Sequence, residues 1–170
     1  MSSPTVPSRE NPGPETVAVT AAGPGSNTTA RIQLVRHGRL PLQLLLGINR
    51  VRRLFDHHSF WARGRSRGAL VRMLLGSCSV VSAWQGGELV GIGRATSDGV
   101  FRAVLWDVVV AEEYQGRGVG RRIVQALLAS PPVVASERVY LMTTNSSGFY
   151  ARLGFTEKHG QHLLVLCRKR

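Results

Sequence analysis

The feature that most constrains the fold is a glycine-rich segment, Gln115-Gly116-Arg117-Gly118-Val119-Gly120-Arg121-Arg122. It follows an apolar run, Ala103 to Val110, and leads into a segment with helical spacing that reaches Leu128. A strand, a tight glycine turn and a helix start direct several backbone N–H groups at one point, where the helix dipole adds partial positive charge. Glycines let that backbone approach a phosphate without side-chain clash. The pattern therefore predicts a site for a phosphorylated ligand.

Other phosphate-binding loops do not match this segment. The P-loop pattern G-x-x-x-x-G-K-[ST] is absent, and Gly116 to Gly120 is G-x-G-x-G rather than G-x-G-x-x-G. The loop also follows the third strand of an antiparallel series, whereas a Rossmann loop follows the first strand of a parallel sheet. Neither a P-loop fold nor a Rossmann fold is therefore expected.

Hydrophobic periodicity predicts the element order β-α-α-β-β-β-α-β-α-β. Three antiparallel strands feed a β-α-β crossover, which predicts an α+β fold with a mixed, mostly antiparallel sheet and flanking helices. The turn between the second and third strands is Gln85-Gly86-Gly87. The expected strands are Arg31–Arg39, Ser79–Trp84, Glu88–Ala95, Val104–Val110, Arg138–Thr144 and His162–Arg168, and the expected helices are Leu40–Phe55, Ser66–Leu75, Val119–Ala129 and Ser146–Leu153.

Length and composition predict one folded domain, residues 31–170, after a disordered tail, residues 1–30. The tail is rich in Ser, Thr, Pro and Gly, and a plastid transit peptide is a weaker interpretation of it. No apolar run approaches the ~20 residues of a membrane helix. No cysteine and histidine spacing indicates a zinc site. We expect a cytoplasmic protein of a bacterial cytosol, with the plastid stroma as the alternative.

The charge is strongly positive: the formal net charge is +12 at pH 7, from 22 basic and 10 acidic residues. Between Arg31 and Arg72 there are ten arginines and a single acid, Asp56. This region predicts a surface that faces a polyanion, either phosphates, RNA or acidic proteins. A merely solvated face is the plain alternative, and no RNA-binding signature is present.

A second motif lies downstream and carries a family resemblance. Asn145, Phe149-Tyr150 and Leu153-Gly154-Phe155 match the "N…FY…LGF" element of the GNAT superfamily of N-acetyltransferases, and Gln115, Gly118 and Gly120 match its [RQ]-x-x-G-x-[GA] loop. The chain resembles this family over about residues 77 to 168. The segments 94–101 and 105–110 are similar to its cyanobacterial and plastid branch. That branch includes enzymes that act on serotonin-like arylalkylamines or on protein lysines and N-termini.

The resemblance implies acetyl-CoA as co-substrate and no metal. The pyrophosphate would lie on the N–H groups of Gln115 to Gly120, with added contacts from Arg117, Arg121 and Arg122. The pantetheine arm would pair with the strand before the loop, and the N–H of Val108 or Val109 would polarise the thioester carbonyl. The implied cofactor-binding residues are Val108, Val109, Val110, Gln115, Gly116, Arg117, Gly118, Val119, Gly120, Arg121, Asn145 and Tyr150.

Three residues are candidates for proton transfer. Tyr150 matches the family's general acid, which protonates the leaving thiolate, and its alternative is a tyrosine packed beside Phe149. Asp107 is the first choice for the base that deprotonates the amine, and its alternative is hydrogen bonding to loop N–H groups. Asp98 is the second choice, with a plain turn residue as the alternative. Asn145 would bond the cofactor arm or simply cap the following helix.

These observations predict an acetyl-CoA-dependent N-acetyltransferase whose acceptor is an arylalkylamine or a protein lysine or N-terminus. A non-catalytic module that binds acetyl-CoA or RNA is the alternative, and a longer acyl group is a third hypothesis. The arginine-rich region disfavours a free polyamine as acceptor. The protein would be a monomer or a homodimer, in which the predicted strand Leu163–Cys167 could pair across the dimer.

Overall fold

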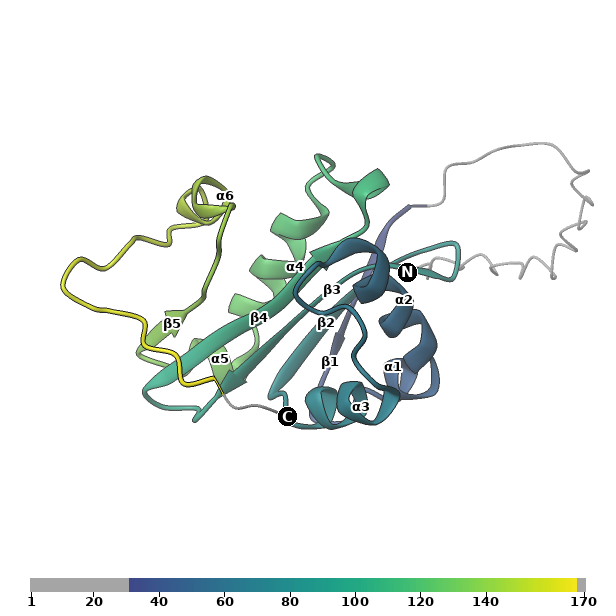
Figure 1. Ribbon diagram of the computed structural model, residues 1–170, viewed down its shortest axis with the longest axis horizontal. Coiled ribbons are helices and arrows are strands. Elements are labelled where there is room, and N and C mark those ends of the chain that lie inside the picture. Colours follow the sequence, from purple (N-terminus) through teal and green to yellow (C-terminus); the bar gives the residue numbers. More distant parts are fainter. Residues whose placement is uncertain (1–30, 168–170) are drawn as a thin grey trace, which may run out of the picture.

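The computed structural model describes residues 31–167, and its framework is one five-stranded sheet in the order β1-β2-β3-β4-β5 (Figure 1). The β1/β2, β2/β3 and β3/β4 pairs are antiparallel, and the β4/β5 pair is parallel. The predicted α+β class with a mostly antiparallel sheet is confirmed. The strands are β1 Gln33–His37, β2 Ser79–Gln85, β3 Glu88–Ser97, β4 Arg102–Val110 and β5 Arg138–Tyr140.

Helices cover both faces of the sheet and divide the core into two parts. The α2-side core lies under α1 (Leu42–Leu46), α2 (Ile48–His58) and α3 (Arg67–Leu75). The α4-side core lies under α4 (Val119–Leu128) and α5 (Pro131–Val134). A 3-10 helix, η1 (Glu112–Tyr114), joins β4 to the glycine turn, and α6 (Ser147–Ala151) follows β5. The fully buried side chains include Leu44, Val51, Leu70 and Leu74 in the first core and Val81, Ile123, Val124 and Leu127 in the second.

Helix α4 packs unusually close to β3 because β3 presents glycines to it. A Cβ added to Gly93 would lie 2.7 Å from Ile123 Cγ2 and 3.1 Å from Leu127 Cδ1, and one added to Gly91 would lie 3.0 Å from Ile123 Cδ1. Distances below about 3 Å are shorter than real carbon contacts. The absence of side chains at Gly91 and Gly93 thus lets Ile123 and Leu127 of α4 pack directly against β3.

Strand β4 carries a bulge opposite Gly93. Its register with β3 shifts between Ile92 and Arg94, and Asp107 has a φ of 49°, the one positive φ of a non-glycine residue within residues 31–167. Before the bulge, Ala103 and Leu105 pack in the α4-side core. After it, Val108 and Val110 do so. The alternation of side chains therefore reverses at Asp107.

Several predicted elements differ from those found. The helix expected over Leu40–Phe55 divides into α1 and α2 at Gly47, whose φ of −95° and ψ of 27° lie outside the helical region. An unpredicted short helix, α5, begins at Pro131-Pro132, since proline suits a first helical turn. The strand predicted over Arg138–Thr144 is only three residues long.

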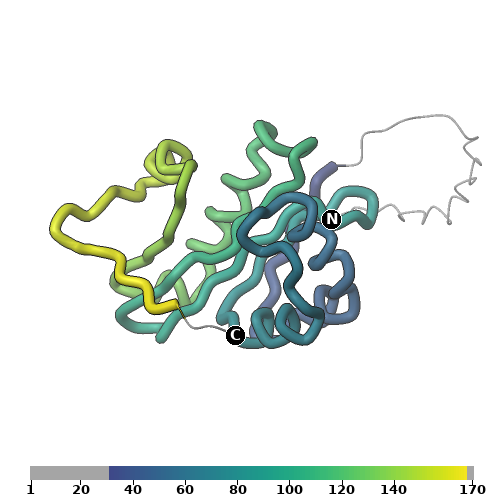
Figure 2. Tube along the Cα trace, in the orientation of Figure 1, coloured from purple at the N-terminus to yellow at the C-terminus, as the bar shows by residue number. Residues whose placement is uncertain are grey.

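The strand predicted over His162–Arg168 is wrong for its described part, residues 162–167, which has no regular structure. After β5 the chain leaves the sheet, passes through α6 and turns back as an extended segment (Figure 2). Leu163, Leu164, Val165 and Leu166 are 68% to 89% exposed. Strand formation needs a neighbouring backbone, and a favourable sequence alone does not supply one.

The predicted tail, residues 1–30, lies outside the described residues. Over residues 31–167, no helix combines the length and the apolar character that crossing a bilayer requires.

Candidate active site

The site is built on the second half of β4, which has an uncovered edge. Strand β5 pairs only with residues 102–104 of β4. On the other edge, Ala111 N–H donates to Val90 O at 2.9 Å, and Val109 pairs with Ile92. Because N–H directions alternate along a strand, Val109 N–H points toward β3, whereas those of Val108 and Val110 point away from it. Of the two predicted carbonyl-binding donors, the register favours Val108.

The glycine turn continues this edge with free backbone donors. Gly116 and Gly118 have φ values of 70° and 76°, and Gly118 is the left-handed N-cap of α4. The first intrahelical donor of α4 is Arg122 N–H, which bonds Gly118 O. The N–H groups from Gly116 to Arg121 have no acceptor among the described residues. Free donors at a glycine turn and a helix start suit a pyrophosphate.

Gln115, Arg117 and Arg122 already have partners within the protein, and phosphate contacts of the arginines stay a prediction. Gln115 N–H already bonds Glu112 O at 3.0 Å, so the free donors begin at Gly116. Its side-chain Nε2 donates to Val110 O at 3.0 Å and thereby ends the open edge of β4. Arg117 lies over the Tyr114 ring at 5.6 Å, and Arg122 Nη2 donates to Ile32 O at 3.2 Å. Arg121 is exposed at the helix start.

The second motif meets the first where α6 approaches α4. A Cβ on Gly120 would lie 3.6 Å from Phe149 Cζ and 3.7 Å from Val110 Cγ2. Tyr150 is half-buried against the α4-side core, with ring centroids 4.9 Å from Phe149 and 5.9 Å from Phe155. Burial raises the pKa of the Tyr150 phenol. The phenol therefore remains protonated at neutral pH, as a proton donor must.

Asp107 is held by two arginines on the opposite face of β4. Arg94 Nε lies 2.6 Å from Oδ2, and Arg65 Nη1 lies 3.2 Å from Oδ1. The aspartate side chain is only 7% exposed. Asp107 and Val108 thus face opposite sides, as expected, but guanidinium groups rather than loop N–H groups bind the carboxylate. Arg65 and Arg94 were not predicted as partners, because 42 and 13 residues separate them from Asp107.

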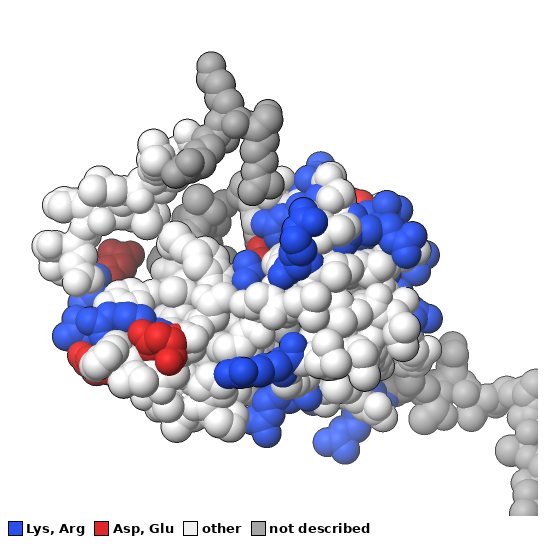
Figure 3. Space-filling model, turned by 90° about the horizontal axis from the view of Figure 1, so that it is seen from below, with Lys and Arg blue, Asp and Glu red and all other residues white. Residues whose placement is uncertain are grey.

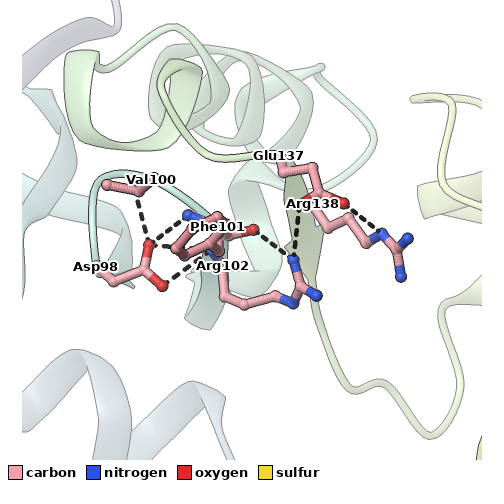
Figure 4. A network of polar contacts seen from close by, with 6 residues as sticks. All are labelled: Asp98, Val100, Phe101, Arg102, Glu137 and Arg138. Atoms are coloured by element: carbon pink, nitrogen blue, oxygen red, sulfur yellow. Dashed lines mark hydrogen bonds and ion pairs between the residues drawn. The ribbon is translucent and has the colours of Figure 1, made fainter.

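Asp98 lies at the other end of β4 (Figure 4). Its Oδ1 accepts from the N–H groups of Val100, Phe101 and Arg102 at 2.8 to 3.0 Å. These backbone hydrogen bonds, Arg102 and Val100 foremost, lower the pKa of the Asp98 carboxyl. Six residues of strand, about 20 Å, separate Arg102 from Val108. The structure therefore brings Asp98 to a turn and not to the other candidate residues.

Asn145 is exposed just before α6. Ser146 takes the N-cap position of that helix, without a side-chain capping bond, so the capping alternative for Asn145 is not realised. That Asn145 bonds the cofactor arm stays a prediction.

The site combines backbone groups that can bind a cofactor with side chains that can transfer protons. An open strand edge can pair with an amide-bearing chain, and the free N–H groups beyond it can bind phosphates. The Val108 N–H points to the open edge of β4, the Tyr150 ring packs on the α4 side, and the Asp107 carboxylate is bound by Arg65 on the α2 side. No three His, Cys, Asp or Glu side chains converge as a metal site within residues 31–167.

These features match a known family. Residues 48–155 match the model of the acetyltransferase (GNAT) family. The chain belongs to this family. The predicted resemblance is thereby confirmed over most of the described residues.

Curated relatives of this GNAT protein include chloroplast and cyanobacterial members. It is 41% identical over 70 residues to a chloroplastic serotonin N-acetyltransferase of Oryza sativa, covering 41% of this chain and 35% of that one. It is 33% identical over 101 residues to an uncharacterised N-acetyltransferase of Prochlorococcus marinus, covering 56% of each. The matched part spans only 27% and 42% of two chloroplastic GCN5-related N-acetyltransferases of Arabidopsis thaliana.

Solved structures share the fold. A GNAT family protein from Xanthomonas campestris aligns with a TM-score of 0.64 at 27% identity, covering 76% of this chain and 87% of that one. An aminoglycoside N-acetyltransferase in complex with CoA aligns with a TM-score of 0.59 at 15% identity, covering 85% and 99%. The second likeness concerns the fold alone.

Proposed function

We propose that this GNAT protein transfers the acetyl group of acetyl-CoA to a primary amine by direct attack in a ternary complex. The observation that carries the proposal is the continuity of the open β4 edge with the free N–H groups of Gly116 to Arg121. An amide-bearing arm can pair along Val108 and Val110 while its pyrophosphate occupies the turn. Acetyl-CoA supplies the arm, the phosphates and an acetyl thioester.

The residues have separate tasks in this proposal. Val108 N–H donates to the oxygen that becomes negative when the amine attacks the carbonyl carbon. Tyr150, whose pKa is raised by burial, gives its proton to the sulfur as the carbon–sulfur bond breaks. Asp107 is the proposed acceptor of the amine proton, directly or through water, from the opposite face of β4. Asp98 is the weaker candidate because its carboxylate already accepts three turn N–H groups.

The acceptor is proposed to be an arylalkylamine or a protein lysine or N-terminus. One relative is named a serotonin N-acetyltransferase, which favours an arylalkylamine. The tryptophan side chains offer an arylalkylamine little exposed surface. Trp84 is buried and bonds Ser82, and Trp106 is half-buried and bonds Thr96. Among the three tryptophans, all of which lie within residues 31–167, Trp61 is the most exposed, at 50%. We also propose a cytosolic or stromal location, in keeping with chloroplastic and cyanobacterial relatives, and a monomer or homodimer.

Calorimetry with acetyl-CoA and a thiol-release assay with amines test the function. We expect binding at protein concentrations near ~10 µM and release of free coenzyme A that depends on the amine. If acetyl-CoA does not bind even at protein concentrations well above this value, the transferase proposal is wrong.

A matched pair of variants makes the test specific to the turn. Gly118 and Gly99 have φ values of 76° and 77°, and a Cβ added to either residue would have no atom within 4 Å. Alanine at either site therefore costs a similar ~1 kcal/mol of backbone strain. We expect Gly118→Ala to weaken acetyl-CoA binding about tenfold or more, because the turn donors shift. Gly99→Ala should leave the dissociation constant unchanged.

A non-catalytic module that binds acetyl-CoA or RNA is the second candidate, and the arginine-rich surface favours it. In that case acetyl-CoA or RNA would bind without amine-dependent thiol release. RNA affinity would fall steeply with salt, since counterions are released on binding.

A further inference from the structure

Arginines on α2, α3 and the loop between them form one surface, called here the α2–α3 basic surface. Figure 3 shows most Lys and Arg side chains on the right-hand half of the view, the half on which α2 and α3 lie in Figure 1, and few Asp and Glu side chains there. Asp56, the single acid within residues 48–75, is engaged by Gly64 N–H at 2.9 Å. Among the described residues, only Arg65 of this set has an ion pair. The arginines are Arg50, Arg52, Arg53, Arg63, Arg65, Arg67 and Arg72.

This surface runs beside the reacting part of β4. At one end, Arg65 contacts Asp107 at 3.2 Å and lies 5.6 Å from the Phe55 ring centroid, which ties the loop to the bulge. At the other end lies a groove of about 510 Å³ between α2 and the β2–β3 hairpin. Arg50 and Arg53 line its α2 side, and Glu88, Ala111 and Glu113 line the opposite side. From Asp107 to Ala111 the strand extends about 13 Å, which is the length of four extended peptide residues.

The same loop adds exposed aromatic rings. Phe60 and Trp61 are 69% and 50% exposed, and their rings pack edge to face with centroids 5.0 Å apart. Arginine with tryptophan and phenylalanine is the composition of protein–protein interface centres. Arginine beside exposed aromatic rings also occurs on surfaces that bind single-stranded nucleic acid. An acetyl acceptor must carry a primary alkyl amine, however, and a polypeptide supplies one as a lysine or an N-terminus, so a polypeptide is favoured over a nucleic acid.

We infer that the α2–α3 basic surface binds an acidic polypeptide segment that carries the acceptor amine. This inference rests on the proposed function and narrows its substrate class. The ammonium of an approaching lysine or N-terminus is repelled by the unpaired arginines. Flanking carboxylates offset that repulsion and pair with Arg50, Arg53 and Arg63, while Phe60 and Trp61 cover apolar side chains of the segment.

Two short peptides that differ only in charge test the inference. One has a lysine flanked by glutamates, and its twin has glutamines in their place. We expect kcat/KM for acetylation to be about tenfold higher for the acidic peptide, with the difference shrinking between about 50 and 300 mM salt. Equal values for the twins, or a higher value for an arylalkylamine than for either peptide, would overturn the inference.

Two variants with the same charge change locate the effect. Arg53 lines the groove, whereas Arg138 lies on β5, where Arg138 pairs with Glu137 at 3.3 Å. We expect Arg53→Glu to lower kcat/KM for the acidic peptide about threefold to tenfold and to leave the neutral twin unchanged. Arg138→Glu should change neither value. An equal loss of kcat/KM in both variants would mean that the net charge of the protein, and not this surface, determines the preference for the acidic peptide.

Fluorescence anisotropy with labelled acidic peptide separates the inference from the proposed function. Peptide binding that Arg53→Glu abolishes, without any acetyl transfer, would keep the surface assignment and remove the transferase proposal. No peptide binding would overturn the surface assignment even if acetyl-CoA is turned over with another amine. Displacement of the peptide by a tighter-binding RNA oligonucleotide would also overturn it and assign the surface to nucleic acid.

Discussion

Tyr150 combines two properties that a general acid of this reaction requires. Its ring is fixed between Phe149 and Phe155, and its burial raises the pKa of the phenol. Because a phenol ordinarily titrates near ~10, the raised pKa keeps the proton in place throughout the neutral range. A single hydroxyl group therefore provides the most direct test of the proposed chemistry.

We expect Tyr150→Phe to lower kcat by about a hundredfold and to leave the dissociation constant of acetyl-CoA unchanged. The variant retains the ring and its packing and removes only the donated proton. Thiol release in the wild type should decline only above pH ~10, as the phenol ionises, and this decline should be missing in the variant. A kcat within twofold of wild type would assign Tyr150 to packing alone.

Asp107 is either the base or a positioning residue for Arg65 and Arg94, and the pH profile distinguishes these roles. If it is the base, Asp107→Asn should lower kcat about tenfold to a hundredfold at pH 7, with recovery at higher pH as free amine forms in solution. A positioning role predicts an equal loss at every pH. The free energy of unfolding must be measured in parallel, because the substitution also removes the ion pairs with Arg65 and Arg94, whose side chains are 32% and 16% exposed.

At the scale of elements, the local patterns were predicted well and the long-range contacts were not. Helix α4, the β2–β3 hairpin and the parallel crossover follow from periodicity and glycine positions within short windows. The ion pair between Asp107 and Arg65 could not be predicted, because it joins β4 to a loop 42 residues away. The missing last strand has the same cause, since a strand requires a partner that its own residues do not specify.

The packing of α4 on β3 gives a prediction about an element pair. We expect Gly93→Ala to lower the free energy of unfolding by about 1–3 kcal/mol, because the new methyl group would overlap Ile123. Gly38→Ala is the matched control, since no atom lies within 4 Å of its added Cβ. Chemical denaturation measures both. A Gly93→Ala variant as stable as Gly38→Ala would mean that α4 can retreat from the sheet without cost.

The whole molecule has a buried polar contact that couples its stability to pH. His37 on β1 is buried, its Nε2 lies 2.7 Å from Ser82 Oγ, and Trp84 Nε1 donates to the same oxygen. Burial lowers the pKa of His37 below its usual value of 6.5. The unfolded chain therefore binds more protons than the folded protein once the pH falls below about 6.5.

It follows that stability contributed by neutral His37 is fully present above pH ~6.5 and is lost as the pH falls toward the lowered folded-state pKa. We expect the denaturation midpoint of the wild type to decrease as the pH is lowered from about 7.5 to about 5. The decrease should be smaller in His37→Gln, which keeps a polar group near Ser82. Equal pH dependence of the two proteins would show that His37 does not contribute.

If the proposed function holds, the reversal of side-chain alternation at Asp107 would place the two substrates on opposite faces of one strand. A compound that links the coenzyme A sulfur to an acceptor amine through an acetyl bridge would therefore cross β4 at the bulge. Its two halves would rest on different layers of the molecule, the glycine turn on one side and the loop of residues 59–66 on the other. Such a compound should slow backbone hydrogen exchange in both segments at once, although they share no element of secondary structure.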